Sequence, residues 1–255
     1  MRIKLEDVST GYGHHVVAQG LNAVLEQGEL VSLLGTNGAG KSTLLRTIGG
    51  FQPMLGGRIL MGDTSLSDLT QAEMSRMVSV VLTERIEIQG LSVHDLVAMG
   101  RAPYTGFWGN LKLEDESIVN DAIRQAGITD LASRMVCSLS DGERQKAVLA
   151  KSLAQQTPVI LLDEPTAFLD YPSKIETMRL LKYLAHSMKK IILLSTHDVE
   201  LALQLSDKLW LMDTHGLCMG SPRLLADNGT IARFFQCAGT EFCPETLTFV
   251  LNGDS

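Results

Sequence analysis

A glycine-rich stretch at residues 35–43 constrains the fold of this chain more than any other part of its sequence. It reads GTNGAGKST and contains the pattern G-x-x-x-x-G-K-[ST], with an apolar run before it and a helix-forming run after it. Glycine permits positive φ, so successive backbone N–H groups at the start of a helix can point at phosphate oxygens. The stretch therefore predicts a loop that binds the phosphates of a nucleoside triphosphate.

Each residue type in this loop has a chemical role. Lys41 would lie on the β- and γ-phosphates, and the Ser42 hydroxyl would be a ligand of Mg²⁺. Thr43 would begin the helix that Gly49 and Gly50 end. The alternative is a glycine-rich turn with a chance lysine. The residues that we assign to nucleotide binding here are Gly35, Thr36, Asn37, Gly38, Ala39, Gly40, Lys41, Ser42 and Thr43.

Two adjacent acids end the apolar run PVILLDE at residues 158–164. Such a run suits a strand covered on both faces, and ligands of open α/β sheets lie at the carboxyl ends of strands. Asp163 would hold Mg²⁺, directly or through water, and Glu164 would orient and deprotonate the water that attacks the γ-phosphate. A structural role is the alternative, but the two carboxylates repel each other, which a cation or a function would offset.

Two further side chains are candidates for the same site. His197 follows the predicted strand 191–195 and could hydrogen-bond the γ-phosphate and the attacking water, although a lone histidine is more often structural. Tyr12 lies between Gly11 and Gly13, where its ring could stack on a nucleotide base or simply pack on the turn.

Composition narrows the class of protein. The 255 residues suffice for one large α/β domain or two small ones, and 45% hydrophobic with 20% charged residues is ordinary globular composition. A net charge of −7 without a Lys/Arg cluster argues against a nucleic-acid partner. The four cysteines form no C-x-x-C pair, so we expect reduced thiols. Because the sequence shows no apolar run long enough to span a bilayer and no signal peptide, we expect membrane association only through another protein or a surface contact.

The remaining pattern alternates strands and helices. Predicted strands lie at 3–8, 16–24, 57–61, 78–82 and 208–212, and predicted helices begin at Pro172 and span 199–205. Residues 92–134 look like a helical insertion in an α/β core, with Val93, Leu96 and Val97 on one face and Ile118, Ala122, Ile123 and Ala126 on another. The aromatic-rich loop 100–108 either is exposed for a partner or caps these helices. From Phe234 onwards the pattern is weak, and we infer no function from it.

The order of these motifs resembles that of one family, the ATP-binding subunits of ABC transporters. Tyr12 is similar to the family's adenine-stacking aromatic, GTNGAGKS to its Walker A loop and ILLDEP to its Walker B strand. LSDGE at Leu139–Glu143 resembles the signature motif, Asp170 the D-loop aspartate and His197 the switch histidine. The resemblance covers essentially the whole chain.

The resemblance implies a fold, a substrate and partners. The fold would be α/β, a P-loop NTPase (RecA-like) core with an N-terminal antiparallel β subdomain and an inserted helical subdomain at about 84–150, within one ATPase domain spanning 1–255. ATP with Mg²⁺ would be sandwiched in a head-to-tail homodimer, where Ser140 and Gly142 of the signature face the partner's γ-phosphate. The homodimer would drive integral membrane permease subunits, served by a substrate-binding protein, from the cytoplasmic face of the inner membrane.

Three positions depart from the family's pattern. Asp141 and Glu143 replace a glycine and a glutamine of the usual LSGGQ, which puts carboxylates beside a polyanion unless they point away as helix caps. Thr83 stands where the family has the Q-loop glutamine, so the coupling between nucleotide and helical segment is in doubt. The expected metal ligands are accordingly Ser42, Asp163 and Thr83.

A last resemblance concerns the transported substrate. Gly100-Arg101-Ala102-Pro103 is similar to the G-R-x-P segment of ATPases that serve iron–siderophore, haem and vitamin B12 (cobalamin) permeases, and it would mark the permease type; the alternative is an exposed turn that only connects helices. Two rival functions remain at this stage. A soluble ABC ATPase acting on nucleic acid or in regulation would usually carry two cassettes or a coiled coil, and a nucleotide sensor without turnover would not need Glu164 and His197.

Overall fold

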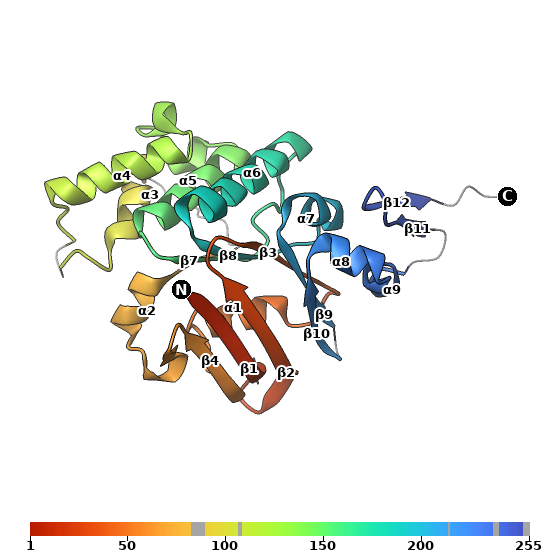
Figure 1. The fold of residues 1–255 in the computed structure, drawn as a ribbon. Helices are drawn as coiled ribbons and strands as arrows, with labels where there is room; N and C mark the ends of the chain where they lie inside the picture. Colours follow the sequence, from red (N-terminus) through yellow and green to blue (C-terminus); the bar gives the residue numbers. More distant parts are fainter. Residues whose placement is uncertain (83–89, 107–108, 214, 237–239, 252–255) are drawn as a thin grey trace.

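A six-stranded sheet forms the centre of the molecule (Figure 1). The computed structural model describes residues 1–82, 90–106, 109–213, 215–236 and 240–251. The strand order is β10-β9-β3-β8-β7-β6, and all neighbours are parallel except β10 and β9. The strands are β3 (Leu30–Gly35), β6 (Val78–Val81), β7 (Val159–Leu162), β8 (Ile191–Ser195), β9 (Lys208–Asp213) and β10 (Gly216–Gly220).

The strand order explains why distant motifs meet. β3, which leads into the phosphate loop, pairs with β8, and β8 pairs with β7. In the register Leu33 lies opposite Ser195, while Leu162 lies opposite Leu194. The residues that follow these three strands therefore gather at one edge of the sheet, where open α/β sheets bind ligands.

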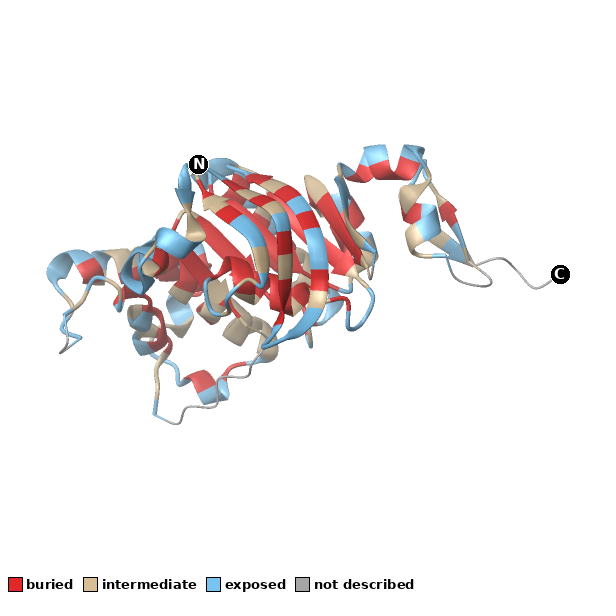
Figure 2. Ribbon diagram, turned by 90° about the horizontal axis from the view of Figure 1, so that it is seen from below, coloured by how far each residue is buried: buried red, intermediate tan, exposed pale blue. Residues whose placement is uncertain are grey.

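The two faces of the central sheet are covered by different layers. Antiparallel strands cover one face together with α1 (Lys41–Ile48), and helices cover the other (Figures 1 and 2). Neighbouring residues of β7 alternate between the two cores: Leu161 belongs to the first and Leu162 to the second. The antiparallel sheet consists of β1 (Arg2–Tyr12), β2 (His15–Glu26), β4 (Gly56–Met61) and β5 (Thr64–Ser65).

Helices between β6 and β7 form the second layer together with α6 (Tyr171–Met188). They are α3 (Val93–Ala98), the short 3₁₀ turn η2 (Met99–Arg101), α4 (Leu113–Gln125) and α5 (Asp141–Ala154). The predicted face of α3 is confirmed, because Val93, Leu96 and Val97 are buried. On α4 the predicted residues Ala122 and Ile123 are buried and Ile118 is partly buried, while Val119, which the pattern did not single out, is fully buried.

The connector after α3 differs at Arg101 from the exposed turn that was the alternative interpretation of this segment. Arg101 is only 5% exposed, and its Nε donates to Asp115 Oδ1 over 2.9 Å. Its guanidinium also donates to the carbonyl of Ala154 at 2.9 Å and lies over the ring of Tyr104. Arg101 therefore ties η2 to α4 and to the end of α5. Phe107 and Trp108 of the aromatic-rich loop lie outside the described residues.

The chain beyond β9 contains more structure than its pattern indicated. The helix α7 (Val199–Leu205) and the strand β9 were predicted, whereas the hairpin partner β10 was not. The tail is weakly patterned in sequence, yet aromatic packing orders part of it: Phe242 is buried and contacts the Phe249 ring. The remaining elements are η1 (Leu66–Asp68), α2 (Gln71–Met77), η3 (Thr129–Leu131), η4 (Val136–Ser138), α8 (Pro222–Asp227), α9 (Thr230–Phe234), β11 (Thr240–Cys243) and β12 (Thr248–Leu251).

Among the described residues, no helix is both long enough and apolar enough to cross a membrane.

Candidate functional site

The phosphate loop connects β3 to α1, and glycine is required at two of its positions. A Cβ on Gly35 would lie 2.2 Å from the carbonyl oxygen of Met212, because β9 runs alongside. Gly40 has φ 98°, and a Cβ there would approach Val17 Cγ1 to 2.7 Å. The helix begins at Lys41, two residues before the predicted start at Thr43, since the loop already turns into it at Gly40.

Lys41 lies across the mouth of this loop. Lys41 is 8% exposed, and its Nζ donates a hydrogen bond to the carbonyl of Gly35 at 2.9 Å. Burial lowers the pKa of Lys41, while the nearby carboxylates of Glu164 and Asp163 act in the opposite direction. An ammonium group that is partly stripped of water and bound only to carbonyls would interact strongly with phosphate oxygens.

Asp163 joins the loop to the neighbouring strands. Its Oδ1 accepts a hydrogen bond from Ser42 Oγ at 3.0 Å and another from Ser195 Oγ at 2.7 Å. Asp163 is 8% exposed, so its carboxylate is largely shielded from solvent. The predicted metal ligands Ser42 and Asp163 are thus brought together.

The oxygen atoms of Ser42 and Asp163 fit Mg²⁺, which prefers oxygen ligands and usually keeps several waters and substrate phosphates. Over the described part of the chain, no group of three or more His, Cys, Asp or Glu side chains could hold a metal ion by itself. Water and the phosphates of a bound nucleotide would supply further ligands of a metal at this position. The third expected ligand, Thr83, lies outside the described residues.

Glu164 is held in an unusual backbone conformation beside Asp163. Its φ is 50°, which is uncommon for a residue other than glycine, and its N–H donates to Ser195 Oγ at 2.9 Å. Burial raises the pKa of Glu164, and the charge of Asp163 raises it further. His197 and Lys41 lower this pKa, and the His197 side chain contacts the Glu164 carboxylate at 3.1 Å. A carboxyl group tuned in this way suits a general base.

Tyr12, at the end of β1, contacts the first turn of α1. The Thr43 hydroxyl donates to Tyr12 Oη at 3.3 Å, and the tyrosine is 52% exposed. The exposed ring is consistent with stacking on a base, and the contact fixes its hydroxyl end at α1. Thr43 itself is buried.

The signature segment forms the start of α5. Ser140 is the N-cap residue: its Oγ accepts from the N–H of Glu143, and the Glu143 carboxylate accepts from the N–H of Ser140 at 2.8 Å. Arg134 also donates to Glu143 at 3.2 Å, while Asp141 pairs with Arg144 at 2.7 Å. The two unusual carboxylates are therefore bound within their own chain. These bonds lower the pKa of Glu143, the backbone bond to Ser140 contributing most.

Ser140 and Gly142 do not join the cluster around Lys41. The hydrogen bonds of Ser140 stay at the start of α5, and Gly142 faces Ser173 of α6, where a Cβ would lie 3.0 Å from Oγ. Asp170, the predicted D-loop residue, caps α6 through the N–H of Ser173 at 3.0 Å. The chain thus presents two separate groups of predicted site residues.

Sequence reasoning missed Ser195. Its hydroxyl touches both predicted acids, yet in the sequence it is only the last residue of an apolar strand. Its place at the carboxyl end of a predicted strand was the available signal, because ligand sites of open α/β sheets lie at the carboxyl ends of strands.

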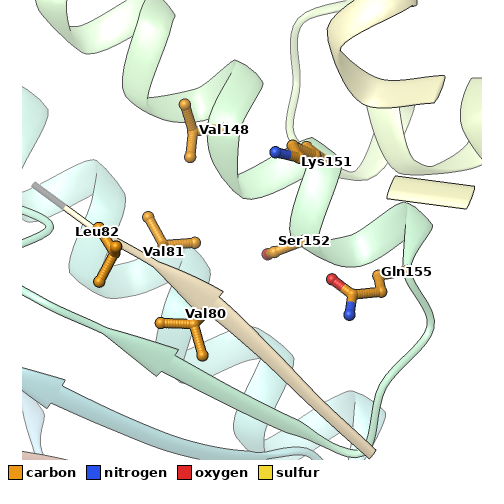
Figure 3. Close-up of a pocket in the computed structure, with 7 residues that line it drawn as sticks. All are labelled: Val80, Val81, Leu82, Val148, Lys151, Ser152 and Gln155. Carbon is orange, nitrogen blue, oxygen red and sulfur yellow. The ribbon is translucent and has the colours of Figure 1, made fainter. Parts of the chain in front are cut away.

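A groove lies away from the nucleotide site, between β6 and α5. Figure 3 shows its inner part, of about 220 Å³. A second part, of about 590 Å³, shares Val80, Lys151 and Gln155 and reaches Phe51 and α2. Phe51 is 70% exposed. The inner part is lined by Val80, Val81, Leu82, Val148, Lys151, Ser152 and Gln155.

Gln155 holds the end of this groove together. Its Nε2 donates to the carbonyl oxygens of Ser75 at 2.7 Å and Val78 at 3.2 Å. Arg76, next to Ser75, donates to the carbonyl of Pro103. Side chains at the end of α5 and on α2 are thus bonded to main-chain carbonyls across the groove.

Comparisons with known proteins identify the family. The family model described as "ABC transporter" matches residues 18–167. An uncharacterised ABC transporter ATP-binding protein of Methanocaldococcus jannaschii is 40% identical over 84% of this chain and 73% of its own length. YusV of Bacillus subtilis, a probable siderophore transport system ATP-binding protein, is 38% identical over 78% of this chain and 73% of its own length. The chain belongs to the ABC transporter family, whose ATP-binding domains are ATPases.

Solved structures agree with this assignment. An inward-facing structure described as a metal-chelate type ABC transporter has a TM-score of 0.79 and 26% identity, covering 97% of this chain and 94% of that chain. A dimeric bacterial ABC transporter cassette has a TM-score of 0.74 and 25% identity, covering 86% of this chain and 98% of that one. The fold is that of a P-loop NTPase with an antiparallel β subdomain. Other similar proteins are named for petrobactin, iron(3+)-hydroxamate and cobalamin import.

Proposed function

We propose that this chain hydrolyses ATP to drive a membrane importer of iron–siderophore, haem or cobalamin. The observation that carries the hydrolytic part is the continuous set of contacts from Ser42 through Asp163 and Ser195 to Glu164 and His197. A binding module without turnover would not need a carboxylate with a raised pKa at that place.

The residues of the candidate site would have different roles in the transfer of the γ-phosphate to water. The loop N–H groups and Lys41 would bind the β- and γ-phosphates of ATP, and the ring of Tyr12 would stack on the adenine. Mg²⁺ held by Ser42 and Asp163 would neutralise phosphate charge. Glu164 would take a proton from the attacking water, and His197 would orient that carboxylate and the water.

We infer further that two copies form a head-to-tail homodimer around two ATP molecules. The N-terminus of α5, with Ser140 and Gly142, is separate from the chain's own phosphate loop, so it is available for the nucleotide of a partner subunit. Asp141 and Glu143 are already paired within the chain, which reduces their repulsion towards that nucleotide.

The groove beside Phe51 is our candidate for the permease contact. Apolar side chains line it together with Lys151 and several uncharged polar residues, and it lies between β6 and α5. We propose that residues of about 84–150 are the inserted helical subdomain of a single ATPase domain spanning 1–255. The contact would place the chain at the cytoplasmic face of the inner membrane. A substrate-binding protein would complete the system.

The proposed substrate class rests on relatives that are named as ATP-binding proteins of siderophore transport, petrobactin import and cobalamin import, and on the segment Gly100–Pro103. The burial of Arg101 means that this segment shapes the helical layer and does not contact cargo. Its connection to the cargo is therefore through the permease that fits this layer.

The test combines hydrolysis with transport. Purified protein should release phosphate from Mg²⁺–ATP, and Glu164→Gln should cut turnover by roughly 10²–10⁴-fold while ATP still binds. A strain without the gene should lose uptake of labelled ferric siderophore, haem or cobalamin, and regain it with the parent gene but not with Lys41→Ala. Full uptake of all three, with another solute lost instead, would refute the substrate class and leave the ATPase assignment intact.

A further inference from the structure

Ser195 occupies the junction of the two acids that the proposed hydrolysis uses. It ends β8 next to β7 and is fully buried. Its Oγ donates to Asp163 Oδ1 over 2.7 Å and accepts from the N–H of Glu164 over 2.9 Å. One hydroxyl therefore binds the side chain of the first acid and the backbone of the second.

The bond to the Glu164 amide acts where the backbone needs support. Glu164 has φ 50°, a conformation that non-glycine residues keep only when their surroundings fix it. Without the Ser195 oxygen, the partly buried N–H of Glu164 would lose its acceptor, which would favour a rotation of the backbone at this residue. The direction of the Glu164 side chain depends on that backbone, because it leaves the chain at the same Cα.

The bond to Asp163 fixes a carboxylate. Ser42 and Ser195 donate to the same oxygen, one from α1 and the other from β8. Two donors on one oxygen, arriving from two elements, restrict the rotation of the carboxylate. Oriented partners of a ligating carboxylate commonly decide how well it holds a metal.

We propose that Ser195 is a positioning residue for ATP hydrolysis, holding Glu164 and Asp163 in a fixed mutual arrangement through its single hydroxyl. The inference rests on the ATPase function proposed above. Ser195 touches neither nucleotide nor water in this scheme; it acts through the two acids. Its loss should therefore change the rate of the chemical step more than the binding of ATP.

The test compares two variants of nearly equal shape. Ser195→Thr and Ser195→Val both add a branch at Cβ, and only the threonine keeps a hydroxyl. We expect Ser195→Val to lower kcat by roughly 10–100-fold, as the loss of such an outer partner does. KM for ATP should stay within about twofold, because the phosphate loop is untouched, and Ser195→Thr should recover most of the rate.

Ser32→Ala is the matched control. Ser32 is a buried serine on β3, opposite Leu194 in the register, and its Oγ lies 2.6 Å from Ser206 Oγ. Its removal also costs a buried hydrogen bond but leaves both acids in place, so kcat should stay within about twofold of the parent.

Equal kcat values for Ser195→Val and Ser195→Thr would overturn the proposal, as would an equal loss in Ser32→Ala. If both branched variants fail to fold, Ser195→Ala decides. A kcat at least roughly tenfold lower at unchanged ATP affinity supports the positioning role, and a parental kcat removes it. Absence of ATP hydrolysis in the parent protein would be a failure of the proposed function instead.

Discussion

Among the site residues, Glu164 is the one whose pKa is set by opposing effects of burial and charge. Burial and the neighbouring Asp163 raise its pKa, whereas His197 and Lys41 lower it, and the backbone N–H of His197 adds a hydrogen bond to the carboxylate. Burial is the largest of these effects, so the pKa stays above that of an ordinary glutamate. In the proposed role of general base, this raised pKa would bring the carboxylate closer to the pH at which it takes a proton.

The pH dependence of activity should report this balance. Glu164 must be deprotonated to act as a base, so kcat/KM should rise with pH through the pKa of Glu164 in the free enzyme. His197→Ala removes a positive charge that lowers this pKa, and the acid limb should therefore move to higher pH. Measuring kcat/KM between about pH 5 and pH 8 checks this. His186→Ala, at an ion pair with Asp207, is the control and should leave the limb in place.

An acid limb that moves to lower pH in His197→Ala would contradict the assigned role of the histidine charge. A lower rate with an unmoved limb would mean that His197 acts on the nucleotide or the water alone.

Among the elements, the helical layer depends on the buried pair of Arg101 and Asp115. The carboxylate of Asp115, on α4, accepts hydrogen bonds from Arg101 of η2 and from the N–H of Lys112. It therefore caps its own helix and also binds η2. These bonds lower the pKa of Asp115, the backbone bond to Lys112 contributing most. Removing the charge of one partner leaves the other buried without compensation.

Asp115→Asn should therefore destabilise the protein, lowering its melting temperature by roughly 5 °C or more. Asp121→Asn is the matched control on the same helix, because Asp121 pairs with Arg124 at an exposed position, and its melting temperature should hardly change. Scanning calorimetry or circular dichroism at neutral pH measures both. Equal melting temperatures would show that the Arg101 pair does not hold the helical layer together.

The sequence predicted elements whose pattern is local. The strand Ile191–Ser195 was predicted with its observed bounds, since five buried residues of one strand read as an apolar run. The choice of Val119 over Ile118 and the burial of Arg101 were not predictable, because both depend on which neighbours α4 and α5 provide. The hairpin of β11 and β12 was missed for a similar reason: it is ordered by contacts between aromatic rings.

The same distinction applies to the candidate site. Two stretches of sequence indicate their chemistry by their residue types, one with Lys41 and Ser42 and the other with Asp163 and Glu164. Parallel strands bring such stretches to one edge of a sheet. Ser195 carries no such signal, since a serine at the end of a strand has many ordinary roles. Its assignment needed the distances to both acids.

Taken as a whole molecule, the chain carries two halves of a site on separate surfaces. The phosphate loop and its acids lie at the carboxyl edge of the sheet, whereas Ser140 and Gly142 begin α5 and make their bonds there. In the homodimer that we propose, a second copy in head-to-tail orientation would supply the start of its α5 to each phosphate loop, and ATP would then be part of the interface.

The dimer should therefore form only with ATP. In the slowly hydrolysing Glu164→Gln background, light scattering should show monomers without nucleotide and dimers at saturating Mg²⁺–ATP. Adding Ser140→Arg should prevent dimerisation, because a long side chain at the N-cap blocks the approach of the partner's γ-phosphate and removes the cap of α5. Ser117→Arg, at an exposed position on α4, is the control for added charge and size and should still dimerise. Dimers of Ser140→Arg at parental ATP concentrations would mean that the start of α5 does not face the partner's nucleotide.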